Sequence, residues 1–597
     1  MSKFENGSKQ LRKKPNFLIL MVDQERYPSV YETTEIKKWR KEYLVTQELL
    51  KENGLEFQRH YAGSAACSPS RATLYTGQYP SLHGVTQTSG AAKSAYDPDM
   101  FWLDPNAVPT FGHYFIAAGY RTFWKGKWHA SEEDILIPGT KNAYPSYSQT
   151  GVPIPANVNT YLLGDRLNQY GFSGWVGPEP HGSSPRNTGS SAAIGIAGRD
   201  QIYADETARL IHSLEKEEDT SPWLIMCSFV NPHDIAVFGE ITELSPLFNF
   251  PIDPSVPRIP KAPTSNESLS TKPDAQESYK RTYPLALQPI KDNLFYRQLY
   301  YSLQKKVDDE MLKVFKALEQ SCFYEDTIVL FLSDHGELLG AHGELYQKWY
   351  NTYEESIHVP LIIHNPKLLS GREYTDMITS HVDVLPTMLG LAGVDPSQIQ
   401  NELAKSHTEV HPLVGRDLSP LLIGKTQFFR ANEPVYFMTD DDFTRGLNQV
   451  SVSGKSYESV VQPNHIEAII TTMLTGKDRV EEVWKFSRYY DNPQFWSNPG
   501  IDDQTVVQRG DSYKECDDQI GLCITETKEE PVPDQFELYN LTLDPLEQEN
   551  LANEAFQTPE SRVIMNLLNS ALEEQCRQKR LSPTSGSVTG MPSCNDK

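Results

Sequence analysis

The stretch Pro15-Asn-Phe-Leu-Ile-Leu-Met-Val22, followed at once by Asp23-Gln24, decides the fold class of this 597-residue chain. Residues 15–22 form a short apolar run that begins at a proline and ends at an aspartate. Such a run is typical of a strand buried on both faces, as in the centre of a parallel sheet. We therefore predict a central strand over 15–22, with Asp23 at its carboxyl end.

Helical and strand-like segments alternate after this strand. A helix is predicted over 35–53, before Gly54, and helix–strand pairs follow at 110–118 with 120–124, 205–216 with 223–230, and 296–319 with 327–332. The alternation predicts an α/β fold, with a large mixed, mostly parallel sheet flanked by helices. Ligands of such folds bind outside the carboxyl ends of the strands. Polar residues follow three of the predicted strands at that edge: Asp23-Gln24, Asn231-Pro-His233-Asp234 and Ser333-Asp334-His335.

The chain is long enough for a large domain and a smaller one. We predict a catalytic domain over 15–425 and a smaller C-terminal α+β domain over 426–581. Strand-like pieces at 435–438, 468–473 and 483–490 and a helix near 561–578 indicate an antiparallel sheet with one helix in the second domain. The tails 1–14 and 582–597 are expected to be flexible, and the long stretches 136–200 and 236–290 are expected to be lids or substrate rims.

Composition excludes several classes of protein. The longest apolar run is far shorter than the roughly 20 residues that cross a bilayer, so no transmembrane segment is predicted. The formal charge of −24 argues against nucleic acid and acidic membranes as partners, and it requires any site for an anionic substrate to be a local positive pocket. No signal peptide is recognised, and seven cysteines without a zinc-ligand spacing favour a reducing compartment, so we expect a cytoplasmic protein. A local disulfide between Cys516 and Cys523 stays open, with free thiols favoured.

The segment His60-Tyr-Ala-Gly-Ser-Ala-Ala-Cys67-Ser-Pro-Ser-Arg71 contains the pattern C-x-P-S-R, and Thr76-Gly77 follow it. From the residues alone, a thiol beside an arginine would be activated as a thiolate nucleophile. The longer pattern resembles the signature of type I sulfatases, in which this cysteine is converted to formylglycine, whose hydrated aldehyde attacks sulfur. The resemblance implies an alkaline-phosphatase-like fold, formylglycine (3-oxoalanine) at Cys67, and Arg71 as the group that neutralises charge there.

A metal site is predicted where Asp23-Gln24 and Asp334-His335 follow two separate strands, because oxygen and nitrogen ligands that converge suit a hard divalent cation. The resemblance adds Cys67 to this set and implies Ca²⁺, with Mn²⁺ or Mg²⁺ as alternatives. Gln24 and His335 depart from the commonest sulfatase pattern. The Asp-Gln and Asp-His pairs resemble the ligand pairs of the choline sulfatase and phosphonate monoester hydrolase branches of the family.

Further motifs extend the resemblance over nearly the whole chain. Gly126-Lys127-Trp128-His129 looks like the sulfatase motif in which Lys127 would bind a sulfate oxygen and His129 would hold a hydroxyl of the hydrate. His233 and Lys348 match the pair that contacts the ester oxygen, so either could protonate the leaving group. Phe536-Glu-Leu-Tyr-Asn-Leu541 resembles the C-terminal strand of sulfatases.

His465 and the run Asp440-Asp-Asp442 are interpreted as solvated loop residues, although they could reach over the pocket. Lys348 has an alternative interpretation as a surface lysine beside aromatic residues.

These motifs predict a sulfuric ester hydrolase that acts on a small-molecule or carbohydrate sulfate ester and is matured by a formylglycine-generating enzyme. The first alternative is a phosphonate monoester or phosphodiester hydrolase on the same fold, favoured by Gln24 and His335 and opposed by Lys127 and His129. The second is a non-catalytic anion-binding module whose Cys67 is never modified.

Overall fold

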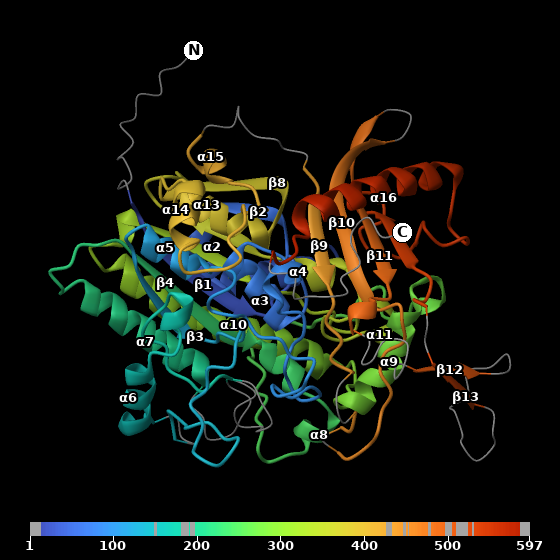
Figure 1. The fold of residues 1–597 in the computed structure, drawn as a ribbon, viewed down its shortest axis with the longest axis horizontal. Helices are drawn as coiled ribbons and strands as arrows, with labels where there is room; N and C mark the ends of the chain where they lie inside the picture. The colour runs from blue at the N-terminus through green and yellow to red at the C-terminus, as the bar shows by residue number, and fades with distance from the viewer. Residues whose placement is uncertain are drawn as a thin grey trace.

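The computed structural model describes residues 14–148, 152–180, 190, 198–424, 433–445, 449–451, 453–475, 479–495, 504–508, 523–527 and 530–584. An eight-stranded mixed sheet with helices on both faces forms the main body, and a four-stranded antiparallel sheet lies beside it (Figure 1). The predicted α/β class with a smaller C-terminal sheet and helix is confirmed. The predicted tails lie almost entirely outside the described residues.

The large sheet has the strand order β3-β4-β1-β5-β7-β2-β6, with β8 paired to β2. Strands β3, β4, β1 and β5 run parallel, whereas β7 pairs antiparallel with β5 and with β2. Their bounds are β1 Asn16–Asp23, β2 Gly54–Tyr61, β3 Arg121–Gly126, β4 Trp223–Pro232, β5 Thr327–Ser333, β6 His358–Val359, β7 Leu361–His364 and β8 Arg372–Ser380. The four parallel strands therefore bring Asp23, Gly126, Pro232 and Ser333 to one edge of the sheet.

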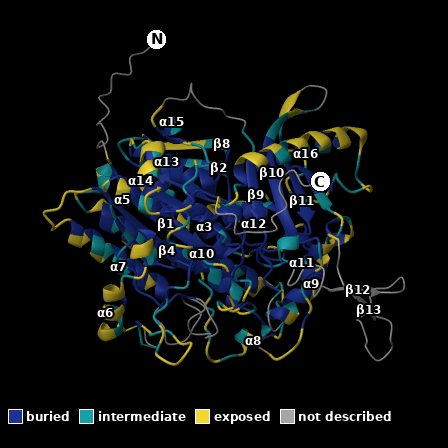
Figure 2. Cartoon of the chain, viewed as in Figure 1, coloured by how far each residue is buried: buried dark blue, intermediate teal, exposed yellow. Residues whose placement is uncertain are grey.

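The central strand β1 is buried on both faces, as its apolar run predicts (Figure 2). Phe17, Ile19 and Met21 belong to a core cluster that includes residues of α3, α5 and α13. Leu18, Leu20 and Val22 face the opposite cluster, which includes residues of α7 and α10. Alternation of side chains along a strand thus places β1 between two helical layers.

The helices of this domain include one correction to the sequence predictions. Their bounds are α1 Thr34–Tyr43, α2 Val45–Glu52, α3 Cys67–Thr76, α4 Pro80–His83, α5 Phe111–Ala117, α6 Pro155–Gly164, α7 Arg199–Leu214, α8 Glu240–Glu243, α9 Asp274–Ala286, α10 Leu294–Glu319, α11 Ala341–Glu344, α12 Glu354–Ile357, α13 Val384–Leu391, α14 Pro396–Leu403 and α15 Ser419–Leu422. The stretches 136–200 and 236–290 contain α6, the start of α7, α8 and α9, and their role as lids or substrate rims stays a prediction.

The correction concerns the single helix expected over 35–53, because the chain forms α1 and α2 with a break at Leu44. Leu44 leaves the helical conformation and is buried in the core. The Asp308 carboxylate accepts the N–H groups of Thr46 and Gln47 at 2.8 and 3.1 Å, which satisfies free donors at the start of α2. Gly54 is the first residue of β2 and does not cap the helix.

The smaller sheet has the order β14-β11-β10-β9 and is antiparallel throughout. Its strands are β9 Val435–Thr439, β10 His465–Thr475, β11 Val480–Tyr490 and β14 Gln535–Asn540, and α16 Pro559–Lys579 follows them. One face packs against Ile564, Leu568 and Leu572 of α16. The other face packs against apolar residues of the large domain, including Tyr61 and Ile357. A separate two-stranded ribbon joins β12 Gln504–Gln508 to β13 Cys523–Thr527.

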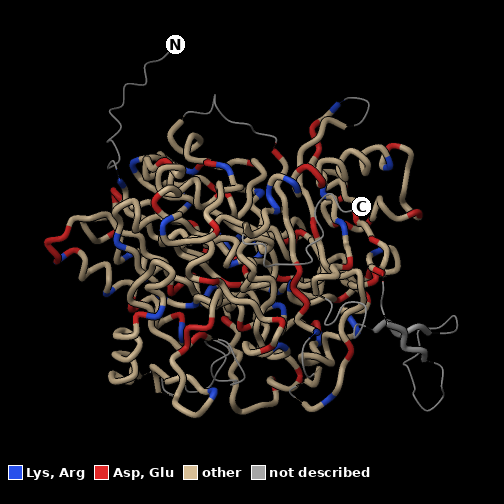
Figure 3. Tube along the Cα trace, viewed as in Figure 1, with Lys and Arg blue, Asp and Glu red and all other residues tan. Residues whose placement is uncertain are grey.

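Among the described residues, no helix has both the length and the apolar character needed to cross a bilayer. Basic and acidic residues are interspersed along the described part of the trace in the view of Figure 3. Cys67, Cys227 and Cys322 are free thiols, whereas Cys576 on α16 is disulfide-bonded. The possible Cys516–Cys523 pair lies outside the residues whose side chains are described.

Candidate active site

The Cys67 side chain is buried at the first residue of α3, directly after the loop that leaves β2. Its sulfur lies 3.1 Å from His335 Nε2 and 3.2 Å from Lys348 Nζ. Lys348 is 1% exposed, so it is a buried residue of this site and not a surface lysine. Two residues that lie 268 and 281 positions further along the chain therefore meet at the Cys67 sulfur.

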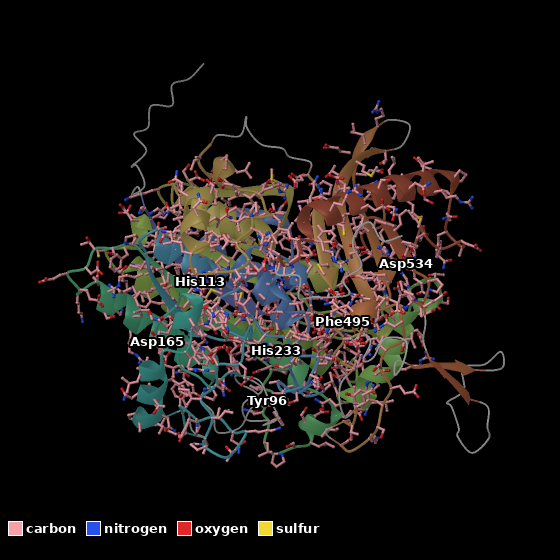
Figure 4. All side chains as sticks on the ribbon, viewed as in Figure 1. Tyr96, His113, Asp165, His233, Phe495 and Asp534 are labelled. Atoms are coloured by element: carbon pink, nitrogen blue, oxygen red, sulfur yellow. The ribbon has the colours of Figure 1, made fainter. Side chains whose placement is uncertain are left out.

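His233 and Asp23 complete the surroundings of this thiol. His233 begins the short 3-10 helix after β4, lies near the centre of the molecule (Figure 4), and is hydrogen-bonded to Cys67. Burial and the Asp23 charge raise the pKa of the thiol, but two nearby lysines and the His233 hydrogen bond outweigh them, so the pKa of Cys67 is lowered. The pocket therefore favours a negative charge at residue 67.

Asp23 is fully buried at the carboxyl end of β1 and is surrounded by cations. Its Oδ2 accepts hydrogen bonds from Lys127 Nζ at 2.6 Å and from Arg71 Nη2 at 2.9 Å. Burial alone would raise the pKa of Asp23, but the charges of Lys127, His233 and Arg71 hold it well below its usual range. Asp23 is therefore a carboxylate at neutral pH.

Arg71 joins the two strand ends that carry the acidic residues. Its Nε donates to Asp334 Oδ2 at 2.9 Å, while Nη2 donates to Asp23. Its remaining nitrogen donates to Ser228 Oγ at 3.0 Å, on β4. The family resemblance implies that Arg71 neutralises charge at residue 67. In the structure, its guanidinium also compensates the negative charges of two buried carboxylates.

Gln24 adopts a left-handed backbone conformation, with φ of 73°, immediately after β1. Its N–H donates to Asp334 Oδ1 at 3.0 Å, and its side-chain oxygen accepts from Lys348 Nζ at 3.0 Å. Its side-chain nitrogen donates to Glu337 Oε2. Glu337 also accepts the N–H groups of Leu339 and Gln347, so its carboxylate fixes which atom of the Gln24 amide faces Lys348.

Asp334 and His335 directly follow β5, at the strand end where the sequence predicted them. His335 Nδ1 lies 3.0 Å from the Gly336 carbonyl oxygen, which can only accept, so Nδ1 carries the proton and Nε2 keeps its lone pair. Burial lowers the pKa of His335 to about 4. His335 is therefore a neutral imidazole that points Nε2 at Cys67 and toward Asp23, whose Oδ1 is 3.6 Å away.

Lys127 and His129 follow β3 and are both buried. Lys127 contacts Asp23, and this charge raises the pKa of Lys127 against the effect of burial. His129 Nε2 lies 3.2 Å from Ser89 Oγ, and its backbone N–H donates to Glu179 Oε1 at 3.1 Å. The two residues of the predicted Lys-x-His motif thus occupy the same edge of the sheet as Cys67.

A divalent cation fits the residues at this edge. Ligand atoms of Asp23, Cys67, Asp334 and His335 all lie within 4.8 Å of one another. The donor set combines two carboxylates with a neutral imidazole whose free lone pair points inward, and hydrogen bonds orient each of them, as is usual around metal ligands. Lys348 contacts both the amide oxygen of Gln24 and the Cys67 sulfur, so Gln24 lies beside this set. The four predicted strand-end residues are therefore brought together.

A second cluster of possible ligands, His342, Glu355 and Glu547, is saturated by charge pairs. Both ring nitrogens of His342 pair with carboxylates, Nδ1 with Glu267 at 2.9 Å and Nε2 with Glu355 at 3.2 Å. Glu547 Oε1 lies 2.7 Å from Lys485 Nζ. The His342 imidazole and the Lys485 ammonium are thus engaged with carboxylates, and burial beside the charge of Glu354 raises the pKa of Glu547 to about 7, so these residues form an ionic network between loops of the two domains.

Residues after β9 contact this site, although the sequence suggested that they are solvated. Asp440, Asp441 and Asp442 are all buried, and so is His465, which pairs with Asp440 at 2.9 Å. The interpretation as solvated loop residues is therefore wrong. The reason is that β9 lies at the edge of the small sheet, against the loop that carries Cys67, so its acidic ending is enclosed between two domains.

Sequence reasoning missed three residues that hold the site together, Ser89, Glu179 and Glu337, and it interpreted a fourth, Asp441, as solvated. Glu337 stands in the segment Ser333-Asp334-His335-Gly-Glu337, two residues beyond a predicted ligand, and could have been found there. Ser89 and Glu179 carry no local signal, because their partners are distant in the chain.

Comparison with known proteins gives a consistent family. A protein-family model described as Sulfatase matches residues 15–394. The "Uncharacterized sulfatase YidJ" of Escherichia coli (strain K12) is 28% identical over 394 residues, which covers 65% of this chain and 69% of the relative. The choline-sulfatase of Rhizobium meliloti (strain 1021) is 26% identical over 416 residues, with the same coverage of 65% and 69%.

Solved structures share the fold over nearly the whole chain. The 2-O GAG sulfatase BT1596 has a TM-score of 0.55 and 20% identity, covering 97% of this chain and 96% of that one. A structure described in complex with its substrate D-Glucosamine-2-N, 6-O-disulfate has a TM-score of 0.56 and 17% identity, covering 96% and 100%. The phosphonate monoester hydrolase of Agrobacterium radiobacter has a TM-score of 0.53 and 18% identity, covering 94% and 96%.

Proposed function

Since this chain belongs to the Sulfatase family, we propose that it hydrolyses a sulfate monoester with residue 67 as the nucleophile, after Cys67 is converted to formylglycine. The observation that carries this proposal is the convergence of His233, His335 and Lys348 on the Cys67 sulfur. A buried nucleophile surrounded by positive and neutral nitrogen groups suits an anionic ester, which the net charge of the molecule as a whole would repel.

Two groups supply chemistry that the unmodified side chains lack. A divalent cation held by Asp23, Gln24, Asp334 and His335, with residue 67 as a further ligand, would polarise the sulfate and favour ionisation of the nucleophile. Formylglycine at residue 67 would supply a hydrated aldehyde, with one hydroxyl as the nucleophile toward sulfur and a second through which sulfate could be released without attack of water on sulfur. We expect Ca²⁺ as the cation, although the imidazole of His335 also suits Mn²⁺.

The chain's own residues bind the sulfate group and move protons. Lys127, which contacts Asp23, and Lys348, which contacts Cys67, would neutralise sulfate oxygens as charge develops. His129, oriented by Ser89 and by Glu179, would accept the proton whose loss releases sulfate. Arg71 keeps the carboxylates of Asp23 and Asp334 in place.

The leaving alcohol takes its proton from His233 or from Lys348 in this proposal, because both contact the side chain of residue 67. A general acid matters most when the leaving group is a poor one. Replacement of the true acid by alanine should therefore slow hydrolysis of an alkyl sulfate by roughly 10²–10⁴-fold and of 4-nitrophenyl sulfate much less. Equal losses on both esters in both variants would contradict the assignment.

The experiment that tests the function is hydrolysis of 4-nitrophenyl sulfate, choline sulfate and sulfated monosaccharides by protein produced with a formylglycine-generating enzyme. The Cys67→Ala variant, which keeps the fold and cannot be modified, is the control. Peptide mass analysis around residue 67 establishes the occupancy of formylglycine. A fully modified protein that hydrolyses none of these esters would refute the proposal and would favour a non-catalytic anion-binding module.

Phosphonate monoester hydrolysis is the second candidate, because Gln24 and His335 differ from the commonest sulfatase ligands and a phosphonate monoester hydrolase shares this fold. Lys127 and His129 favour the sulfatase. Comparison of kcat/KM on 4-nitrophenyl sulfate and on an aryl phosphonate monoester separates the two. A preference for the phosphonate would replace the proposed substrate class and leave the site unchanged.

A further inference from the structure

The end of β9 is docked on the loop that precedes Cys67. The backbone N–H of Met438 donates to the carbonyl oxygen of Gly63 at 3.2 Å, and the Thr439 hydroxyl donates to the carbonyl oxygen of Ala65. β9 is an edge strand of the small sheet, so its second edge is free for this contact. The C-terminal sheet thus touches the backbone two residues before the nucleophile.

The Asp441 carboxylate, which follows directly, binds three N–H groups from three different segments. Oδ2 accepts from the backbone N–H of Ala66 at 3.3 Å and from Trp349 Nε1 at 3.0 Å. Oδ1 accepts from the backbone N–H of Thr88 at 3.0 Å. Asp441 is 4% exposed, so these bonds are made away from water, where a carboxylate acceptor is strongest and hardest to replace.

Each of the three donors stands next to a group of the proposed site. Ala66 precedes Cys67, and Trp349 follows Lys348. Thr88 precedes Ser89, whose hydroxyl lies 3.2 Å from His129 Nε2. One carboxylate from the C-terminal domain therefore fixes the backbone beside the nucleophile, beside a sulfate-binding lysine and beside the partner of the proton acceptor.

The surrounding contacts indicate that this arrangement is specific to Asp441. Its neighbour Asp440 is equally buried, but its side chain accepts from His465, Tyr490 and Asn492, all within the C-terminal domain. The Asp441 side chain is held by the Ala66, Thr88 and Trp349 segments, and the charge of Lys93 lies near it. Its role is therefore exerted through the residues it holds.

We propose that Asp441 is a positioning residue through which the C-terminal domain sets the geometry of the nucleophile, of Lys348 and of the Ser89–His129 pair. The inference rests on the proposed function for its kinetic consequences. A displacement of about 1 Å of a catalytic group costs on the order of 10²-fold in rate. In Asp441→Asn, an NH₂ group replaces one oxygen and faces at least one of the three donors, so the segments must move apart.

The test compares Asp441→Asn with Asp440→Asn, which makes the same chemical change one residue away. We expect kcat of Asp441→Asn on 4-nitrophenyl sulfate to fall by about 10²-fold with a smaller change in KM, at equal formylglycine occupancy and with a Tm close to that of Asp440→Asn. Deuterium uptake of peptides that span residues 62–67 and 86–90 should rise in Asp441→Asn alone.

A second variant keeps the inference testable if Asp441→Asn does not fold. Trp349→Phe keeps an aromatic ring but removes the indole N–H, one of the three donors, and we expect a fall in kcat of about 5-fold with an unchanged Tm. Activity of Asp441→Asn within 3-fold of Asp440→Asn, together with unchanged exchange, would overturn the inference.

The wild-type protein separates this result from the proposed function. If the mature wild-type protein hydrolyses no sulfate or phosphonate ester, the proposed function fails. Deuterium uptake of Asp441→Asn, compared with that of Asp440→Asn, then tests the positioning role by itself. Unchanged uptake at residues 62–67 and 86–90 would overturn that role.

Discussion

Exchange of the Glu337 carboxylate for an amide should reverse the orientation of Gln24 and weaken metal binding. Glu337 Oε1 accepts two backbone N–H groups, from Leu339 at 2.8 Å and from Gln347 at 2.9 Å, while Oε2 accepts the Gln24 amide nitrogen. In Glu337→Gln the oxygen stays with the two backbone donors, so the new NH₂ group faces the Gln24 nitrogen. Gln24 can relieve this conflict only by turning its amide over.

The turned amide points its nitrogen at Lys348 and toward the predicted metal ligands. An unpaired buried donor costs about 1–3 kcal/mol, and loss of the residue that orients a ligand typically costs 10–100-fold in metal affinity. These magnitudes agree, because 10–100-fold corresponds to about 1.4–2.8 kcal/mol. We expect the Kd for Ca²⁺ or Mn²⁺ to rise by 10–100-fold in Glu337→Gln.

The assay is equilibrium dialysis against each metal, supported by Tm as a function of metal concentration. The double variant Gln24→Glu with Glu337→Gln restores a matched pair with the donor and acceptor exchanged, and it should recover the affinity of the wild-type protein to within about 10-fold. Wild-type affinity in Glu337→Gln, or a double variant that binds no better than the single one, would refute the reasoning.

The buried charges and the nucleophile lead to three more expected outcomes. Arg71→Met leaves two carboxylates without their shared cation, and should lower the free energy of unfolding by about 3–5 kcal/mol, measured by denaturant titration, with partial recovery on addition of Ca²⁺. Cys67→Ala should abolish ester hydrolysis while its Tm stays within a few degrees of the wild-type value. Two carboxylates raise the pKa of His342 from 6.5 to about 9 against the effect of burial, so its contribution of about 3 kcal/mol is present below pH ~6.5 and is lost as pH rises through ~9. Tm measured from pH 6 to 10 should therefore fall across this window in the wild-type protein and much less in His342→Gln.

The sequence by itself determined the elements with strong local signals. The apolar run 15–22 predicted β1, because a strand buried on both faces has few alternatives to an unbroken apolar sequence. Parallel strands bring their carboxyl ends to one edge, so the positions of Asp23-Gln24, His233 and Asp334-His335 directly after predicted strands were enough to place them together. The C-x-P-S-R pattern identified Cys67 because its residues are contiguous.

Only the tertiary structure decided how these groups are held. The ligand set is oriented by Arg71, by the Gly336 carbonyl oxygen and by Glu337, and these are choices of geometry that spacing does not encode. Asp441 meets Ala66 across 375 positions of the chain, so its burial depends on the packing of one domain on another. Short acidic runs are usually solvated because burial of a carboxylate is costly. Here three N–H donors from segments distant in sequence offset that cost for Asp441. No local sequence pattern predicts these donors.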